Sequence, residues 1–230
     1  MNAHSRRRVE MGTRALEFSR AHPDSEPGTA EVVARLEQLI ARANETAATQ
    51  RNGVLQVRAA SERKQELRRQ IVAVPIPHLA AVGQAAAREE HELGNAFRFR
   101  PDASTHFAFR TAARGMATAA QQHRELLLKY GLSQSVLDQF VQMLDQFDEA
   151  VVLGYEGRAA RIGATREFRA LATEIFRTAR VMNGRNRQRF ADDAQLLGSW
   201  ISASKVLGQP RPGVEPEGGT PAGGEVRPAA

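Results

Sequence analysis

Apolar residues recur three to four positions apart along most of the chain, which is the spacing that places them on one side of an α-helix. Short stretches rich in proline, glycine or asparagine interrupt this spacing. The pattern therefore predicts two long helices and about four shorter ones. Their expected ranges are 5–21, 29–74, 78–93, 104–130, 134–182 and 187–207.

The first long helix is expected to begin near Thr29, whose side chain suits an N-cap, and to end before Pro75 and Pro77. At 1.5 Å per residue such a helix is roughly 65 Å long. Its weakest point is Asn52-Gly53, because both residues have low helix propensity. The sequence leaves open whether the helix continues through this pair.

The second long helix, after Ser133, carries the strongest helical periodicity in the chain. Three glycines interrupt its pattern, and the sequence leaves its continuity through them open. We interpret them as small residues that let another helix approach closely. Asn183-Gly184 is expected to end this helix. The three interrupting glycines are Gly154, Gly157 and Gly163.

Each long helix has a single apolar stripe, and two such stripes are expected to cover each other. Alanine, leucine, arginine, glutamate and glutamine dominate, and 42% of the residues are hydrophobic, which is enough for a sizeable core. The predicted fold is all-α, a single antiparallel up-and-down bundle over 1–207. Residues 208–230 are rich in proline and glycine, so disorder is expected there.

A shift of 104 positions superimposes several features of the two long helices, with Thr29 on Ser133 and Gly53 on Gly157. An ancestral duplication would produce these matches. However, any two helices with a heptad-like spacing match at some shift, so both explanations stay open. The duplicated halves would be 5–95 and 104–207.

The chain has a formal net charge of +6, and 29 of its 32 basic residues are arginine. A basic balance is typical of proteins that bind nucleic acid, although an arginine-rich surface exposed to water has the same composition. Arginines also suit the C-terminal end of a helix because they complement its macrodipole. The strongest cluster is expected at a turn, and its candidate nucleic-acid contacts are Arg177, Arg180, Arg185, Arg187 and Arg189.

Residues 97–110, FRFRPDASTHFAFR, hold four phenylalanines and form the second candidate region. Alternation of Phe97 and Phe99 with arginines resembles a stacking platform for nucleic acid, but Pro101 ends the alternation. As a link between helices, the segment is interpreted mainly as a connector whose rings pack under the end of the bundle while its arginines reach water.

Catalytic and metal-binding motifs find little support in the sequence. The chain has no cysteine, no Gly-x-Ser-x-Gly motif and no glycine loop that follows a strand. REEHEL at 88–93 carries His91 among three glutamates, but a Glu-x-x-His pair would need an acid at position 88, where Arg88 stands. His123 fails in the same way, because Ala120 precedes it by three residues. We therefore expect no metal, no cofactor and no enzymatic activity.

The N-terminus shows no secretory signal, and no stretch approaches eighteen consecutive apolar residues. A cytoplasmic protein without membrane association is expected. The preferred function is a non-enzymatic structural or interaction module, with an unknown protein partner or a second copy of itself. Nucleic-acid binding is the alternative, and a metal-dependent bundle enzyme is a distant third.

Several segments resemble a family of uncharacterised bacterial proteins of about 200–230 residues. They include RALEFSRAHP, FRTAARGMA, DQFDEA, NRQRFADDAQLL and the GGEVRPAA tail. The resemblance covers nearly the whole chain and implies an all-helical fold. It implies no activity, cofactor or site residue, because none is established for the family.

Overall fold

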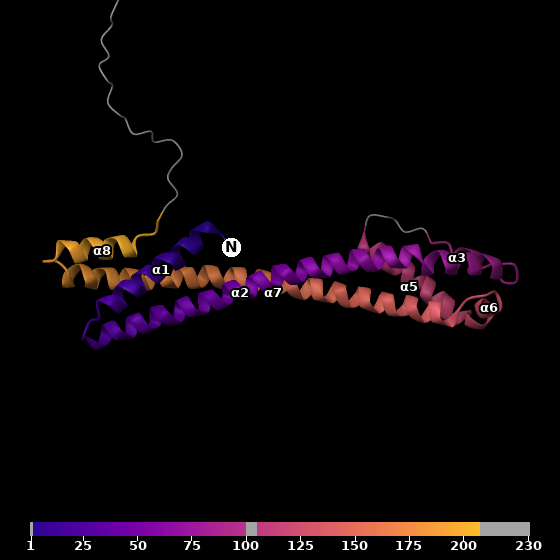
Figure 1. Cartoon of the computed structure of the whole chain (residues 1–230), viewed down its shortest axis with the longest axis horizontal. Coiled ribbons are helices and arrows are strands. Elements are labelled where there is room, and N and C mark those ends of the chain that lie inside the picture. The colour runs from indigo at the N-terminus through magenta and orange to yellow at the C-terminus, as the bar shows by residue number, and fades with distance from the viewer. Residues whose placement is uncertain (1, 100–104, 208–230) are drawn as a thin grey trace, which may run out of the picture. The chain divides into compact units, whose positions relative to one another are not determined.

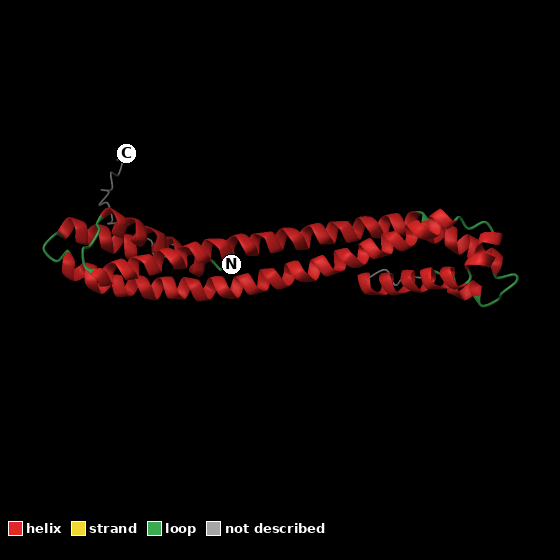
Figure 2. Cartoon of the chain, turned by 90° about the horizontal axis from the view of Figure 1, so that it is seen from below, coloured by secondary structure: helices red, strands yellow, loops and turns green. Residues whose placement is uncertain are grey.

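The computed structural model describes residues 2–99 and 105–207, and the elements within these ranges are helices joined by short loops (Figures 1 and 2). The predicted all-α fold is confirmed. The bounds are α1 Ala3–Ala21, α2 Pro27–Ala73, α3 Pro75–Ala86, α4 Leu93–Ala96, α5 His106–Gln122, α6 Arg124–Lys129, α7 Gln134–Arg189 and α8 Ala194–Ser204. The disorder expected for 208–230 lies outside the described residues.

The chain divides into two compact units. Unit 1 comprises residues 1–43 and 169–230, and unit 2 comprises residues 44–168. The long helices α2 and α7 each contribute to both units. These bounds differ from the halves 5–95 and 104–207, so they give the suggested duplication no support. The single bundle over 1–207 and the duplication stay predictions.

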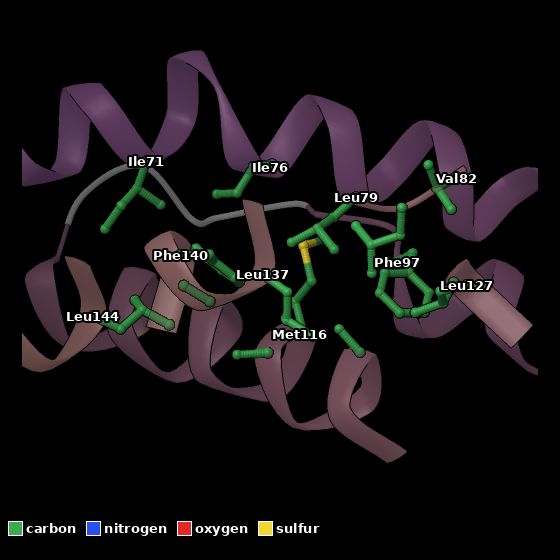
Figure 3. Close-up of a cluster of buried hydrophobic side chains, with 14 of the residues drawn as sticks. Ile71, Ile76, Leu79, Val82, Phe97, Met116, Leu127, Leu137, Phe140 and Leu144 are labelled. Atoms are coloured by element: carbon green, nitrogen blue, oxygen red, sulfur yellow. The ribbon is translucent and has the colours of Figure 1, made fainter. Parts of the chain in front are cut away.

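The core of unit 2 is formed by one side of α2 and one side of α7, closed by the helices between them. Figure 3 shows side chains from α2, α3, α5, α6 and α7 pointing toward one another. Phe97, which follows α4, is fully buried in the same cluster. Gly83 of α3 leaves room for this ring, because a Cβ atom at Gly83 would overlap it. The connector thus helps to close the core.

Within unit 2, the backbones of α2 and α7 approach each other closely at Gly53 and Gly157. A Cβ atom added to Gly53 would lie 2.7 Å from the carbonyl oxygen of Gly157, and one added to Gly157 would lie 3.0 Å from that of Gly53. Such a backbone approach is available only to residues without a side chain. Both helices continue through this crossing. The prediction that small residues of the second long helix let another helix approach closely is confirmed for Gly157, whereas a Cβ atom added to Gly163 would meet no atom within 4 Å.

Unit 1 packs α1 and α8 against the first part of α2 and the last part of α7. Trp200 of α8 is fully buried, and its ring lies 5.4 Å from that of Phe18 in α1. The indole Nε1 donates a hydrogen bond to Asn183 Oδ1 of α7 at 3.1 Å. A Cβ atom at Gly12 would overlap Ile175, so α1 lies directly on α7. The indole therefore ties α8 to two other helices of this unit.

Several predicted boundaries were wrong. α7 continues through Asn183-Gly184 to Arg189, because the side chain of Asn183 bonds to Trp200 instead of competing with the helix backbone. α8 begins at Ala194, with Asp193 as its N-cap, and not near residue 187. α2 begins before Thr29, at Pro27.

The helix expected over 78–93 lies at Pro75–Ala86, and the one expected over 104–130 is divided into α5 and α6. The two ends of the range 104–130 nevertheless agree with the structure. Thr105 caps α5, since its Oγ1 accepts a hydrogen bond from the Ala108 N–H at 3.1 Å. Gly131 follows α6 with φ of +95°, a conformation that L-residues with side chains rarely adopt. The N–H of Leu132 then bonds to the carbonyl of Leu127 at 2.9 Å, and both leucines are buried. These contacts form a Schellman motif that turns the chain into α7.

Candidate functional site

The five candidate arginines lie on the last turns of α7, and not at the expected turn. Arg180 and Arg187 are seven residues apart and share one side of the helix, whereas Arg185 and Arg189 share another. The structure therefore spreads the five over different sides. Arg177 and Arg180 are exposed.

Two of these arginines are occupied by contacts within the chain. Arg185 forms ion pairs with Asp24, at 3.3 Å, and with Glu26. Arg189 donates hydrogen bonds to the carbonyl oxygens of His22 at 3.0 Å and Pro23 at 2.7 Å. These contacts hold the loop between α1 and α2 and leave little of the two guanidiniums for phosphate. Arg187 Nε lies 3.4 Å from Asn183 Oδ1, a weak contact along the same helix.

A pocket of about 430 Å³ lies beside this loop in unit 1. Its walls combine apolar side chains such as Val33 and Val181 with the already paired Arg185 and Arg189. The positive charges in this pocket are therefore largely satisfied by contacts within the chain, so the pocket does not favour a strongly anionic ligand.

The segment 97–110 separates into buried and exposed rings. Phe97 and Phe109 are fully buried, and Phe99 packs against the same core, with its ring 6.0 Å from that of Phe109. The connector interpretation is confirmed for these three. Phe107 is different, because 74% of it is exposed. Residues 100–104 of this segment lie outside the described residues.

Phe107 borders a second pocket, also of about 430 Å³, which we call the unit 2 pocket. It lies between α2, α5 and α7. The chemically informative side chains that line it are Lys64 from α2, His106 and Phe107 from α5, and Tyr155 and Arg158 from α7. The sequence had indicated a candidate region in the segment that holds His106 and Phe107, but it had not indicated Lys64, Tyr155 or Arg158.

The charge around the unit 2 pocket is unevenly compensated. Arg110, which also borders it, forms an ion pair with Asp148 of α7. Arg114 bonds to the same carboxylate at 2.7 Å and to Asp145 at 2.6 Å. Both acids are therefore occupied by α5, and neither is free to balance Lys64 or Arg158.

The pKa of His106 is lowered by the burial of its ring and by the positive charges of Lys64 and Arg68. Its Nδ1 atom is buried and has no hydrogen-bond partner among the described residues. Burial and the two neighbouring positive charges therefore both favour the neutral form of the imidazole.

The pKa of the Asp148 carboxyl is lowered, because the raising effect of its burial is outweighed by hydrogen bonds from Arg110 and Arg114. A lowered carboxyl pKa in the folded state stabilises the fold above the unfolded pKa, and this contribution is lost as pH falls through the folded pKa. Denaturant titrations between about pH 6 and pH 3 should show the wild type losing more stability than Asp148→Asn. Equal losses in both proteins would show that the cluster contributes nothing to the pH dependence.

The histidines and acids considered for a metal site pair differently in the structure. His91 is exposed, and His123 Nδ1 lies 2.9 Å from Glu90. Glu89 accepts bonds from Lys129 at 2.7 Å and from the Tyr130 hydroxyl at 2.8 Å. Within 2–99 and 105–207, no three His, Cys, Asp or Glu side chains are arranged to hold a metal ion.

None of the helices described has both the length and the apolar character needed to cross a bilayer. Comparison of the chain with family models, curated proteins and solved structures gave no match in any of the three. The resemblance to an uncharacterised bacterial family therefore stays a prediction.

Proposed function

We propose that the chain is a non-enzymatic interaction module that associates with a second copy of itself through α2 and α7 of unit 2. The observation that supports this proposal is a group of large aliphatic side chains exposed to water, which we call the aliphatic surface. Each member is between 41% and 56% exposed. The members are Val54 and Leu55 of α2 and Val152, Leu153 and Ile162 of α7.

These side chains are concentrated around the glycine crossing. Each is within five residues of Gly53 or Gly157 along its helix, or roughly 8 Å at 1.5 Å per residue. Val152 and Ile162 also share one side of α7 with exposed Ala159, at separations of seven and three. Concentrated exposed apolar groups on soluble proteins commonly mark interaction sites.

Pairing with another helical chain along the outer side of α7 would remove Val152 and Ile162 from water. Each of these side chains is already about half-buried, so burial of the remainder of one contributes roughly half of the about 1.5–3 kcal/mol that a fully exposed valine or isoleucine would contribute. The arginines of α7 support the alternative function, nucleic-acid binding, less well, because Arg185 and Arg189 are occupied. The cytoplasmic location also remains an expectation.

Sedimentation velocity over a range of protein concentrations tests the proposal. The wild type should move from monomer toward dimer as concentration rises. Val152→Asp should weaken the association by at least about tenfold, because a charge would replace an apolar contact. The matched control is Val181→Asp, another exposed valine of α7, at 65% against 54% for Val152. A constant mass of 25.2 kDa at every concentration would exclude self-association.

A further inference from the structure

The unit 2 pocket contains two cations without compensating partners. Neither Lys64 nor Arg158 forms a hydrogen bond or ion pair with another residue of the described chain. They come from different helices, α2 and α7, and line the same pocket. Arg110 also lines the pocket, but unlike Lys64 and Arg158 it is neutralised by an ion pair, with Asp148. An anion entering the pocket would meet two unpaired positive charges.

The electrostatic potential around His106 is positive. After burial of the ring, the positive charges of Lys64 and Arg68 are the next causes that disfavour its protonation. An anion placed between these groups would reduce this repulsion. The cationic side chains that line the pocket and the lowered pKa of His106 both indicate that a negatively charged ligand would be stabilised there.

Two aromatic rings border the same pocket and remain largely exposed. Phe107 of α5 is 74% exposed, and Tyr155 of α7 is 66% exposed. Exposed rings beside a positive groove are the features on which proteins stack nucleobases. Because Phe107 and Tyr155 come from different helices, the fold brings them to one pocket although they are far apart in sequence.

We propose that the unit 2 pocket binds a small ligand in which a phosphate is joined to a planar heterocycle, as in a mononucleotide. Lys64 and Arg158 would bind the phosphate, while Phe107 and Tyr155 would contact the ring. The pocket volume of about 430 Å³ lies within the range of small-molecule sites. This site goes beyond the proposed self-association and uses none of the side chains of the aliphatic surface.

Isothermal titration of the full chain with AMP is the first test, with adenosine and inorganic phosphate as separate arms. One AMP per chain should bind, at least about tenfold more tightly than either fragment, because only AMP offers both the charge and the ring. Adenosine binding as tightly as AMP would overturn the role of the two cations. Phosphate binding as tightly as AMP would overturn the role of the rings.

Variants test which residues form the site. Lys64→Ala/Arg158→Ala should weaken AMP binding by at least about tenfold and leave adenosine binding unchanged. Phe107→Ala should weaken both. The matched control, Arg177→Ala/Arg180→Ala, removes the same charge from exposed positions of unit 1 and should bind AMP like the wild type. Circular dichroism checks folding, and the single variant Arg158→Gln gives the same test if the double variant is unstable.

Other results would overturn the proposal. Failure of AMP to bind at millimolar concentration would reject the site. A ten-residue oligothymidylate that binds more tightly than AMP, and loses affinity in the Lys64→Ala/Arg158→Ala variant, would make the surface a single-stranded nucleic-acid site instead. Leu55→Asp, on the side of α2 opposite to Lys64, should weaken self-association and retain AMP binding, so failure of self-association and failure of ligand binding are distinguishable.

Discussion

Replacing Trp200 with alanine is expected to lower the free energy of unfolding by about 3–5 kcal/mol, the range measured for large buried aromatic residues. The indole is fully buried, contacts the ring of Phe18 and donates a hydrogen bond to Asn183. Alanine would leave a cavity and an acceptor without its donor. Urea denaturation followed by circular dichroism gives the change.

The neighbouring Ile201 provides the control, because it lies on the same helix and is 39% exposed. Ile201→Ala should change the stability by only about 0.5 kcal/mol. Equal effects of the two substitutions would show that α8 does not hold unit 1 together in the way its buried indole indicates.

The second large effect is expected from Gly53→Ala, which should destabilise the protein although alanine has a higher helix propensity than glycine. Alanine should favour the helix by up to about 1 kcal/mol over glycine. Its Cβ atom, however, would lie 2.7 Å from the carbonyl oxygen of Gly157 and 3.0 Å from the backbone nitrogen of Arg161. Overpacking against backbone that cannot rotate away typically costs about 1–3 kcal/mol, so a net loss of up to about 2 kcal/mol is expected from thermal and chemical denaturation.

Gly163→Ala is the matched control for this steric argument. Gly163 lies in α7 and is exposed, and a Cβ atom added to it would meet no other atom within 4 Å. Alanine there should stabilise the protein by roughly 0.5–1 kcal/mol through propensity alone. Stabilisation by both substitutions would contradict the close backbone approach of α2 and α7.

Sequence periodicity was sufficient to predict the two long helices, because burial of one side of each helix imposes a regular spacing, but it did not predict α4 or the division of 104–130 into α5 and α6. The ends of the range 104–130 were also predicted well, because capping at Thr105 and Gly131 depends on neighbouring residues alone. The helix break expected at Asn183-Gly184 does not occur, because of a contact with a residue outside the helix. Trp200, seventeen residues away, supplies the partner that keeps Asn183 inside a helix.

The candidate site was harder to predict, since it depends on which side chains meet across three helices. A dense run of arginines is visible in sequence, but the acids and carbonyls that occupy Arg185 and Arg189 come from the loop after α1. Lys64 and Arg158 are inconspicuous singly, and only the pairing of α2 with α7 brings them to one pocket. The one available signal was an aromatic residue, Tyr155, at a position outside the apolar stripe.

The placement of Trp200 gives each unit its own intrinsic chromophore. It is the only tryptophan of the chain and belongs to unit 1, whereas both tyrosines, Tyr130 and Tyr155, belong to unit 2. Emission excited selectively from indole therefore follows the melting of one unit, while the far-ultraviolet ellipticity averages over both. Superimposable melting curves from the two signals would mean that α2 and α7 transmit cooperativity along their length, and separated curves would mean that the units unfold independently.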